Sequence, residues 1–271
     1  MKSLTINGGG GVQLHVIDAG NPKAKPFVFI HGFSQSALSW IRQMNSPLAD
    51  TFRLVAMDLR GHGLSDKPRD GYADSRLWAD DVQAVIKVLN LDHPILCGWS
   101  YGPLVILDYL RHYGEENIRG INFVGGVTKL GGDEALSVLT PEFLSLIPGF
   151  FSSDAEESVR SLTALLQMCF ASDLRAADLY TMLGYNVSVP PYVRRALFSR
   201  VFDNDDLLPQ LRKPVLITHG TSDAVVNSAV IDQQMSRIAS AKIEKMATGH
   251  ACFWDDAPGY NAILQKFADG L

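Results

Sequence analysis

The sequence predicts an α/β protein built on a doubly wound, mostly parallel eight-stranded sheet. Short apolar runs alternate along the chain with longer segments in which apolar residues recur at helical spacing, the order typical of successive β-α units. Several apolar runs end in glycine-containing turns that carry polar residues, as strands do at the carboxyl edge of such a sheet. Residues 127–210 show helical periodicity only, so we interpret them as a helical cap inserted into a core formed by 1–126 and 211–271.

The first two strands are expected to be antiparallel. Residues 12–18 alternate apolar and polar side chains, as a half-exposed strand does, and residues 3–7 can pair with them through the glycine turn between. The next two strands, at 27–30 and 53–57, are continuous apolar runs typical of buried parallel strands. A helix is expected between them over residues 37–49.

The rest of the core alternates in the same way. Residues 75–89 place apolar side chains at helical spacing, and the run at 95–97 predicts a buried strand. Further strands are expected at 118–124, 215–220 and 242–246, with helices at 101–113, 228–238 and 258–267. Within the cap, helices are expected at 156–170, 174–183 and 192–202.

The most informative stretch joins the apolar run at 95–97 to the helix at 101–113. It reads Gly98-Trp99-Ser100-Tyr101-Gly102. Glycines two residues either side of a serine let the strand and helix backbones approach closely. The serine is then held in a tight, strained turn that exposes its hydroxyl. Ser100 is therefore the candidate nucleophile.

A serine hydroxyl is a poor nucleophile unless a base takes its proton, and the base needs a carboxylate to orient it. Asp223 follows the strand at 215–220, and His250 follows the last strand, so both are expected at the same sheet edge as Ser100. Their chain order, Ser, Asp, His, differs from the orders of chymotrypsin and subtilisin. His31 and His219 precede glycines at strand ends, and we interpret them as structural.

With these motifs the chain resembles the α/β-hydrolase-fold enzymes that carry a helical cap, and most closely their serine esterase and cofactor-free perhydrolase group. The resemblance extends over nearly the whole length. It implies that the backbone N–H groups of Phe33 and Tyr101 form an oxyanion hole, the second of them at a helix N-terminus. It rests on five motifs in order: His31-Gly32-Phe33-Ser34, Asp58-x-Arg60-Gly61-His62-Gly63-x-Ser65, Gly98-Trp99-Ser100-Tyr101-Gly102, His219-Gly220-x-x-Asp223 and Gly249-His250.

The expected reaction is hydrolysis of small, apolar carboxylic esters through an acyl-enzyme on Ser100. A serine at this position disfavours epoxide hydrolase and haloalkane dehalogenase chemistry, since those relatives place an aspartate there. Two alternatives remain: a cofactor-free oxygenase on the same fold, and a ligand receptor built on a hydrolase scaffold. Trp40, Trp99 and Phe253 flank the motifs and are candidates for lining the substrate pocket, with core packing as the other interpretation.

The composition of the chain disfavours several classes of binding partner. The net charge of -5, from 24 basic and 29 acidic residues, disfavours a nucleic-acid partner. We expect no membrane span and no signal peptide, because no apolar run approaches about 18 residues and the N-terminus has no apolar core. Three scattered cysteines suggest reduced thiols and a cytoplasmic protein, and no clustered Cys/His set implies a metal or cofactor. The sequence favours neither monomer nor dimer, and ester, thioester and lactone substrates are all compatible with it.

Overall fold

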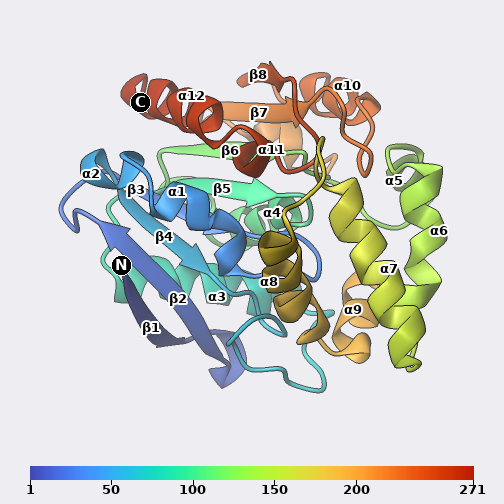
Figure 1. Ribbon diagram of the computed structural model, residues 1–271. Helices are drawn as coiled ribbons and strands as arrows, with labels where there is room; N and C mark the ends of the chain where they lie inside the picture. Colours follow the sequence, from blue (N-terminus) through green and yellow to red (C-terminus); the bar gives the residue numbers. More distant parts are fainter.

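One eight-stranded sheet runs through the computed structural model, which describes residues 1–271 (Figure 1). The strands lie side by side in the order β1-β2-β4-β3-β5-β6-β7-β8. Only the β1–β2 and β2–β4 pairs are antiparallel, so the predicted mostly parallel sheet is confirmed. The strands are β1 (Lys2–Asn7), β2 (Gln13–Gly20), β3 (Pro26–Ile30), β4 (Arg53–Met57), β5 (Ile95–Trp99), β6 (Gly120–Val124), β7 (Val215–Gly220) and β8 (Ala241–Met246).

Burial explains why the strand patterns differ. Every residue of β3, β4, β5, β6 and β7 is buried, because helices cover both faces of the sheet there, and the sequences of these strands are accordingly near-continuous apolar runs. β2 lies near the edge and alternates, with Leu14 and Val16 fully buried and Gln13 exposed.

Two layers of helices sandwich the sheet (Figure 1). The helices α3 (Ser75–Val88) and α4 (Gly102–Tyr113) contact each other and lie behind the sheet in this view. The helices α1 (Ile41–Met44) and α12 (Ala257–Asp269) contact each other on the opposite face. This is the doubly wound arrangement that the alternating pattern predicts. The core is completed by α2 (Leu48–Thr51), α10 (Ala229–Met235) and α11 (Cys252–Asp255).

The single helix expected over residues 37–49 is wrong. The chain forms a 3-10 turn at Ala37–Trp40, then α1, and then α2 after a break. The break falls at Ser46 and Pro47, because proline has no N–H to continue a helix and the Ser46 hydroxyl instead accepts the N–H of Leu48 at 3.2 Å.

The segment between β6 and β7 forms helices and adds no strand to the sheet. Its helices lie beyond the carboxyl ends of β5 and β7, as the arrowheads in Figure 1 show. The apolar side chains buried under them join the core of the sheet in one cluster. Whether 127–210 is a separate structural unit stays a prediction. The helices are α5 (Asp133–Ser137), α6 (Pro141–Phe150), α7 (Ala155–Met168), α8 (Ala176–Val187) and α9 (Pro191–Phe198).

Two features of this segment differ from expectation. Helices α5 and α6 are not predicted from the sequence, because α5 is short and α6 is apolar on most of its surface and contains a proline, Pro148. The helix predicted over 192–202 ends at Phe198, since Phe202 pairs instead with Leu130 through two backbone hydrogen bonds of 2.8 and 3.2 Å.

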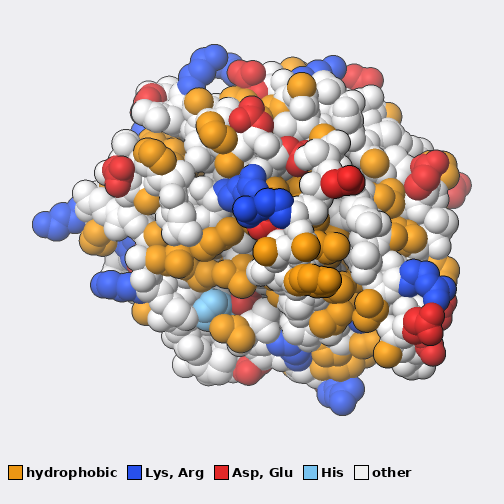
Figure 2. Space-filling model, in the orientation of Figure 1, with side chains coloured by type: hydrophobic (Ala, Val, Ile, Leu, Met, Phe, Trp, Pro, Cys, Tyr) orange, Lys and Arg blue, Asp and Glu red, His pale blue; other side chains and the backbone are white.

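The surface carries charges of both signs. Figure 2 shows acidic and basic side chains interspersed over one face, and hydrophobic side chains gathered across its middle, near the place of α8 in Figure 1. Tyr180 and Val187 of α8 are 72% and 45% exposed and belong to the exposed apolar residues of the chain. None of the helices has the length and unbroken apolar character that crossing a bilayer would need.

Candidate active site

Ser100 occupies the sharp turn between β5 and α4. Its backbone has φ 58°, in the left-handed region that a residue other than glycine adopts only under constraint. Two hydrogen bonds to the chain after β6 hold the turn: the Ser100 N–H donates to the Val124 carbonyl at 3.0 Å, and the Val127 N–H donates to the Ser100 carbonyl at 3.0 Å. The strained conformation is therefore anchored on both sides of the residue.

Gly98 and Gly102 have to be glycines because other parts of the backbone lie where a Cβ atom would be. A Cβ atom on Gly98 would lie 2.7 Å from the Gly102 carbonyl carbon, and one on Gly102 would lie 2.6 Å from the Ile30 carbonyl oxygen. Gly32, after β3, comes equally close, since a Cβ there would lie 2.9 Å from Ser100 Cβ. The loop after β3 and the turn after β5 are thus in contact at Ser100.

His250 and Asp223 meet at the same edge of the sheet. His250 Nδ1 lies 2.8 Å from Asp223 Oδ2, and each of these side chains is only 1% exposed. The other carboxylate oxygen, Oδ1, accepts the N–H groups of Val225 at 2.8 Å and Val226 at 2.9 Å. The carboxylate is therefore fixed by three donors, and it fixes the imidazole in turn.

Two nearby histidines have structural surroundings. His31 Nδ1 lies 2.8 Å from the Gly32 carbonyl, and its Nε2 accepts the Leu59 N–H at 3.0 Å, so both ring nitrogens are used. His219 Nε2 lies 4.0 Å from Asp223 Oδ2. Burial lowers the pKa of His219, which keeps this imidazole neutral beside the carboxylate.

The backbone amides of Phe33 and Tyr101 have no acceptor within the protein. Both residues are buried, and buried N–H groups without a partner are rare in folded proteins. Phe33 follows Gly32, and Tyr101 is the residue that caps the N-terminus of α4. Two free donors therefore flank Ser100, where they can bind a negatively charged oxygen.

Two small cavities border Ser100. The first, about 20 Å³, is lined by Ser100, His250, Trp99 and Gln35 among others, and we call it the His250-side cavity. The second, about 40 Å³, is lined by Ser100 and Tyr101 but not by His250, and we call it the Tyr101-side cavity. Phe33, Phe143 and Val225 border both of them. Ser100 therefore sits between two separate spaces.

A family model described as "alpha/beta hydrolase fold" matches residues 25–257. The chain belongs to the α/β-hydrolase fold family. Among solved structures, an esterase from Rhodococcus sp. ECU1013 is 34% identical, with a TM-score of 0.94 over 100% of both chains. Among curated proteins, an AB hydrolase superfamily protein of Bacillus subtilis (strain 168) is 27% identical over 95% of this chain and 96% of its own.

The names of relatives in this family are not uniform. Epoxide hydrolase 1 of Caenorhabditis elegans is 25% identical over 94% of this chain and 68% of its own. Family membership and the esterase structure support hydrolase activity, and the bond that is cleaved has to be argued from the site.

Of the three aromatic residues expected to line the pocket, Trp99 borders a cavity of this α/β-hydrolase core, and Trp40 and Phe253 do not. Trp99 lines the His250-side cavity, and its Nε1 donates to the His250 carbonyl at 3.1 Å. Trp40 and Phe253 line neither cavity, which favours core packing, the other interpretation of these two residues. They stack on each other with ring centroids 4.0 Å apart, and both are buried in the core. Trp40 also packs against Phe29 of β3, which turns it toward the sheet.

Several cavity residues are not indicated by the sequence. Phe143, Leu165, Cys169 and Phe198 come from the helical segment, and no motif marks them. Burial raises the pKa of the Cys169 thiol well above its usual value, so Cys169 contributes an apolar surface and no thiolate. Gln35, by contrast, directly follows the motif His31-Gly32-Phe33-Ser34, and this position could have marked it as a cavity residue.

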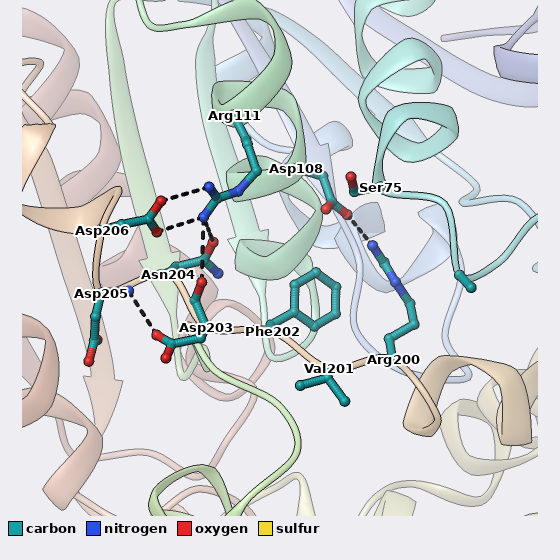
Figure 3. Close-up of a pocket in the computed structure, with 11 residues that line it drawn as sticks. Ser75, Asp108, Arg111, Arg200, Val201, Phe202, Asp203, Asn204, Asp205 and Asp206 are labelled. Carbon is teal, nitrogen blue, oxygen red and sulfur yellow. Dashed lines mark hydrogen bonds and ion pairs between the residues drawn. The ribbon is translucent and has the colours of Figure 1, made fainter.

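The helical segment is anchored to the helix that follows Ser100. Figure 3 shows this junction, a cavity of about 530 Å³ that contains none of the residues named above as reactive. Arg200 donates to Asp108 of α4 at 2.7 Å, and both side chains are 3% exposed. Arg111 of α4 binds Asp206 with two hydrogen bonds of 2.8 Å. Arg200 also lies 3.3 Å from the Tyr101 hydroxyl, which links this junction to the turn at Ser100.

Proposed function

We propose that this protein is a serine hydrolase that cleaves small carboxylic esters through an acyl-enzyme on Ser100. One observation carries the proposal: Ser100, held at φ 58°, lines one cavity with His250, whose Nδ1 is bound to the buried Asp223 carboxylate. A nucleophile, a base and a group that orients the base are the parts that acyl transfer needs.

In the first step Ser100 Oγ attacks the acyl carbon while His250 Nε2 takes the hydroxyl proton. Asp223 accepts the Nδ1–H of His250, which keeps Nε2 unprotonated before the attack and stabilises the imidazolium after it. The carbonyl oxygen becomes negatively charged and accepts hydrogen bonds from the free amides of Phe33 and Tyr101. His250 then gives its proton to the alcohol oxygen as the bond from that oxygen to the acyl carbon breaks.

In the second step water attacks the acyl carbon, and the bond from this carbon to Ser100 Oγ breaks. His250 Nε2 takes a proton from the water and returns it to Ser100 Oγ as the carboxylic acid leaves. His250 gives away the proton that it takes in each step, so Ser100, His250 and Asp223 end the cycle in their starting protonation states. No electron is transferred in either step, and the reaction requires no cofactor.

We assign the two halves of the ester, the alcohol and the acyl chain, to the two cavities beside Ser100. The alcohol oxygen must come within hydrogen-bond reach of His250 Nε2, which assigns this oxygen and the atoms next to it to the His250-side cavity. The acyl chain then occupies the Tyr101-side cavity, whose wall is mainly apolar. Its one charged residue, Lys129, has its ammonium bound by Glu134 and Asp205 at 2.6 Å each.

The size of this cavity predicts a preference for short acyl chains. At about 40 Å³ it is far below the roughly 300–1,000 Å³ of pockets for drug-sized ligands. Against p-nitrophenyl acetate, butanoate and octanoate we expect kcat/KM for octanoate to be at least about 100-fold below that for acetate, since each methylene that does not fit costs about 1–3 kcal/mol. Initial rates of p-nitrophenol release measure this directly.

Two results would count against the proposal. Release of no more than one p-nitrophenol per protein molecule would favour the receptor alternative, because a receptor has no need of deacylation. An octanoate rate equal to the acetate rate would contradict the assignment of the acyl chain to the Tyr101-side cavity.

A further inference from the structure

Gln35 is a buried polar residue in the wall of the His250-side cavity. It is 2% exposed, and most of its neighbours there, such as Trp99, Phe143 and Leu165, are apolar. Apart from the proposed catalytic residues, it is the one cavity residue with a strongly polar side chain. A primary amide in such a place is costly unless each of its polar ends has a partner.

The orientation of the Gln35 amide follows from Asn186 of α8. Asn186 Nδ2 donates to the Met182 carbonyl at 2.9 Å, which identifies the nitrogen end of that side chain. The same Nδ2 lies 3.4 Å from Gln35 Oε1. The oxygen of Gln35 therefore faces Asn186, and its Nε2 is the opposite end of the amide.

Gln35 Nε2 donates to no acceptor in the protein, although it carries two N–H groups. Gln35 Nε2 is not among the side-chain atoms that are both buried and unpaired, so it still has access to open space beside the cavity. Methionine or leucine would occupy similar space but would offer no donor there. The loop itself does not need the side-chain N–H groups, since the Gln35 backbone N–H closes the turn onto the Gly32 carbonyl at 3.3 Å. The free donor is therefore suited to a ligand and not to folding.

We propose that Gln35 determines specificity by donating a hydrogen bond from Nε2 to an oxygen atom in the alcohol half of the ester. The inference rests on the proposed function, which assigns the alcohol to the cavity that Gln35 and His250 share. The substrates favoured are short esters of alcohols that carry an ether, hydroxyl or carbonyl oxygen near the ester bond. A plain alkyl alcohol leaves the Gln35 donors unpaired.

The test compares two esters of matched size, butyl acetate and 2-methoxyethyl acetate, in which one methylene is exchanged for an ether oxygen. Acid release gives kcat/KM for each ester with the wild type and with Gln35→Met, which keeps the chain length and removes the donor. We expect the ratio of kcat/KM for methoxyethyl over butyl acetate to fall by about 5- to 10-fold in Gln35→Met, the worth of one neutral hydrogen bond. Differences in intrinsic ester reactivity cancel between the two proteins.

Gln35→Leu serves as a second variant, so that poor folding of one substitution does not decide the outcome. Gln265→Met, on the exposed face of α12, is the matched control and should keep the wild-type ratio. An unchanged ratio in both Gln35 variants would overturn the inference. Equal losses on both esters would also overturn it, because Gln35 would then act on the reacting carbonyl. A wild type that cleaves neither these esters nor p-nitrophenyl acetate would instead refute the proposed function itself.

Discussion

Replacing Ser100 with alanine is expected to lower kcat on p-nitrophenyl acetate by about a millionfold, the scale seen when a serine hydrolase loses its nucleophile. The variant has no oxygen to attack the acyl carbon. The free amides of Phe33 and Tyr101 remain and still favour direct attack by water, so a slow residual rate above the uncatalysed one is expected. Steady-state rates at saturating ester measure the loss.

The same variant separates the hydrolase from the oxygenase alternative. In an oxygenase the His250–Asp223 pair deprotonates the substrate and Ser100 is secondary, so a substantial part of the activity would survive the substitution. Ser145→Ala is the matched control: its hydroxyl lies on α6 and donates only to the Glu142 carbonyl, and we expect wild-type kcat. A Ser100→Ala protein that keeps a tenth or more of the wild-type kcat would contradict the proposed mechanism.

Replacing Asp223 with asparagine is expected to lower kcat by about 10,000-fold while the protein stays folded. The reason lies in the three donors around the carboxylate. The asparagine oxygen would take the N–H groups of Val225 and Val226, which turns its NH₂ group toward His250 Nδ1. Nδ1 must then accept, so the ring proton moves to Nε2, and Nε2 can no longer take the proton of Ser100.

Asp232→Asn, an exposed position on α10, is the control for the loss of one negative charge, and we expect it to leave kcat unchanged. Thermal unfolding of both variants shows whether the fold is retained. If a well-folded Asp223→Asn protein kept most of its activity, His250 would be oriented by another group, and the role of the carboxylate would have to be abandoned.

The positions of the inner parallel strands were predictable because these strands are buried on both faces and form near-continuous apolar runs, as at β3 and β4. The positions of Ser100, Asp223 and His250 at one edge follow from the same parallel order, since each residue comes just after a strand. Sequence periodicity fails where a helix is apolar on most of its surface, as in α6, or short and interrupted, as around Pro47.

Pocket residues were harder to predict, because proximity to a motif does not say which way a side chain turns. Trp40 and Phe253 flank motifs and yet stack on each other inside the core. The Gln35–Asn186 contact joins residues 151 positions apart and depends on how α8 packs against the loop after β3. Only the folded chain brings these two amides together.

The central claim is that Ser100 is an activated nucleophile, and labelling with a serine-reactive fluorophosphonate tests it most directly. The phosphonyl group mimics the acyl carbon, and fluoride leaves when Ser100 Oγ attacks phosphorus. Peptide mapping by mass spectrometry is expected to place one label per chain on Ser100, with no label on Ser100→Ala. A native protein that stays unlabelled, or that carries the label on another residue, would contradict the claim.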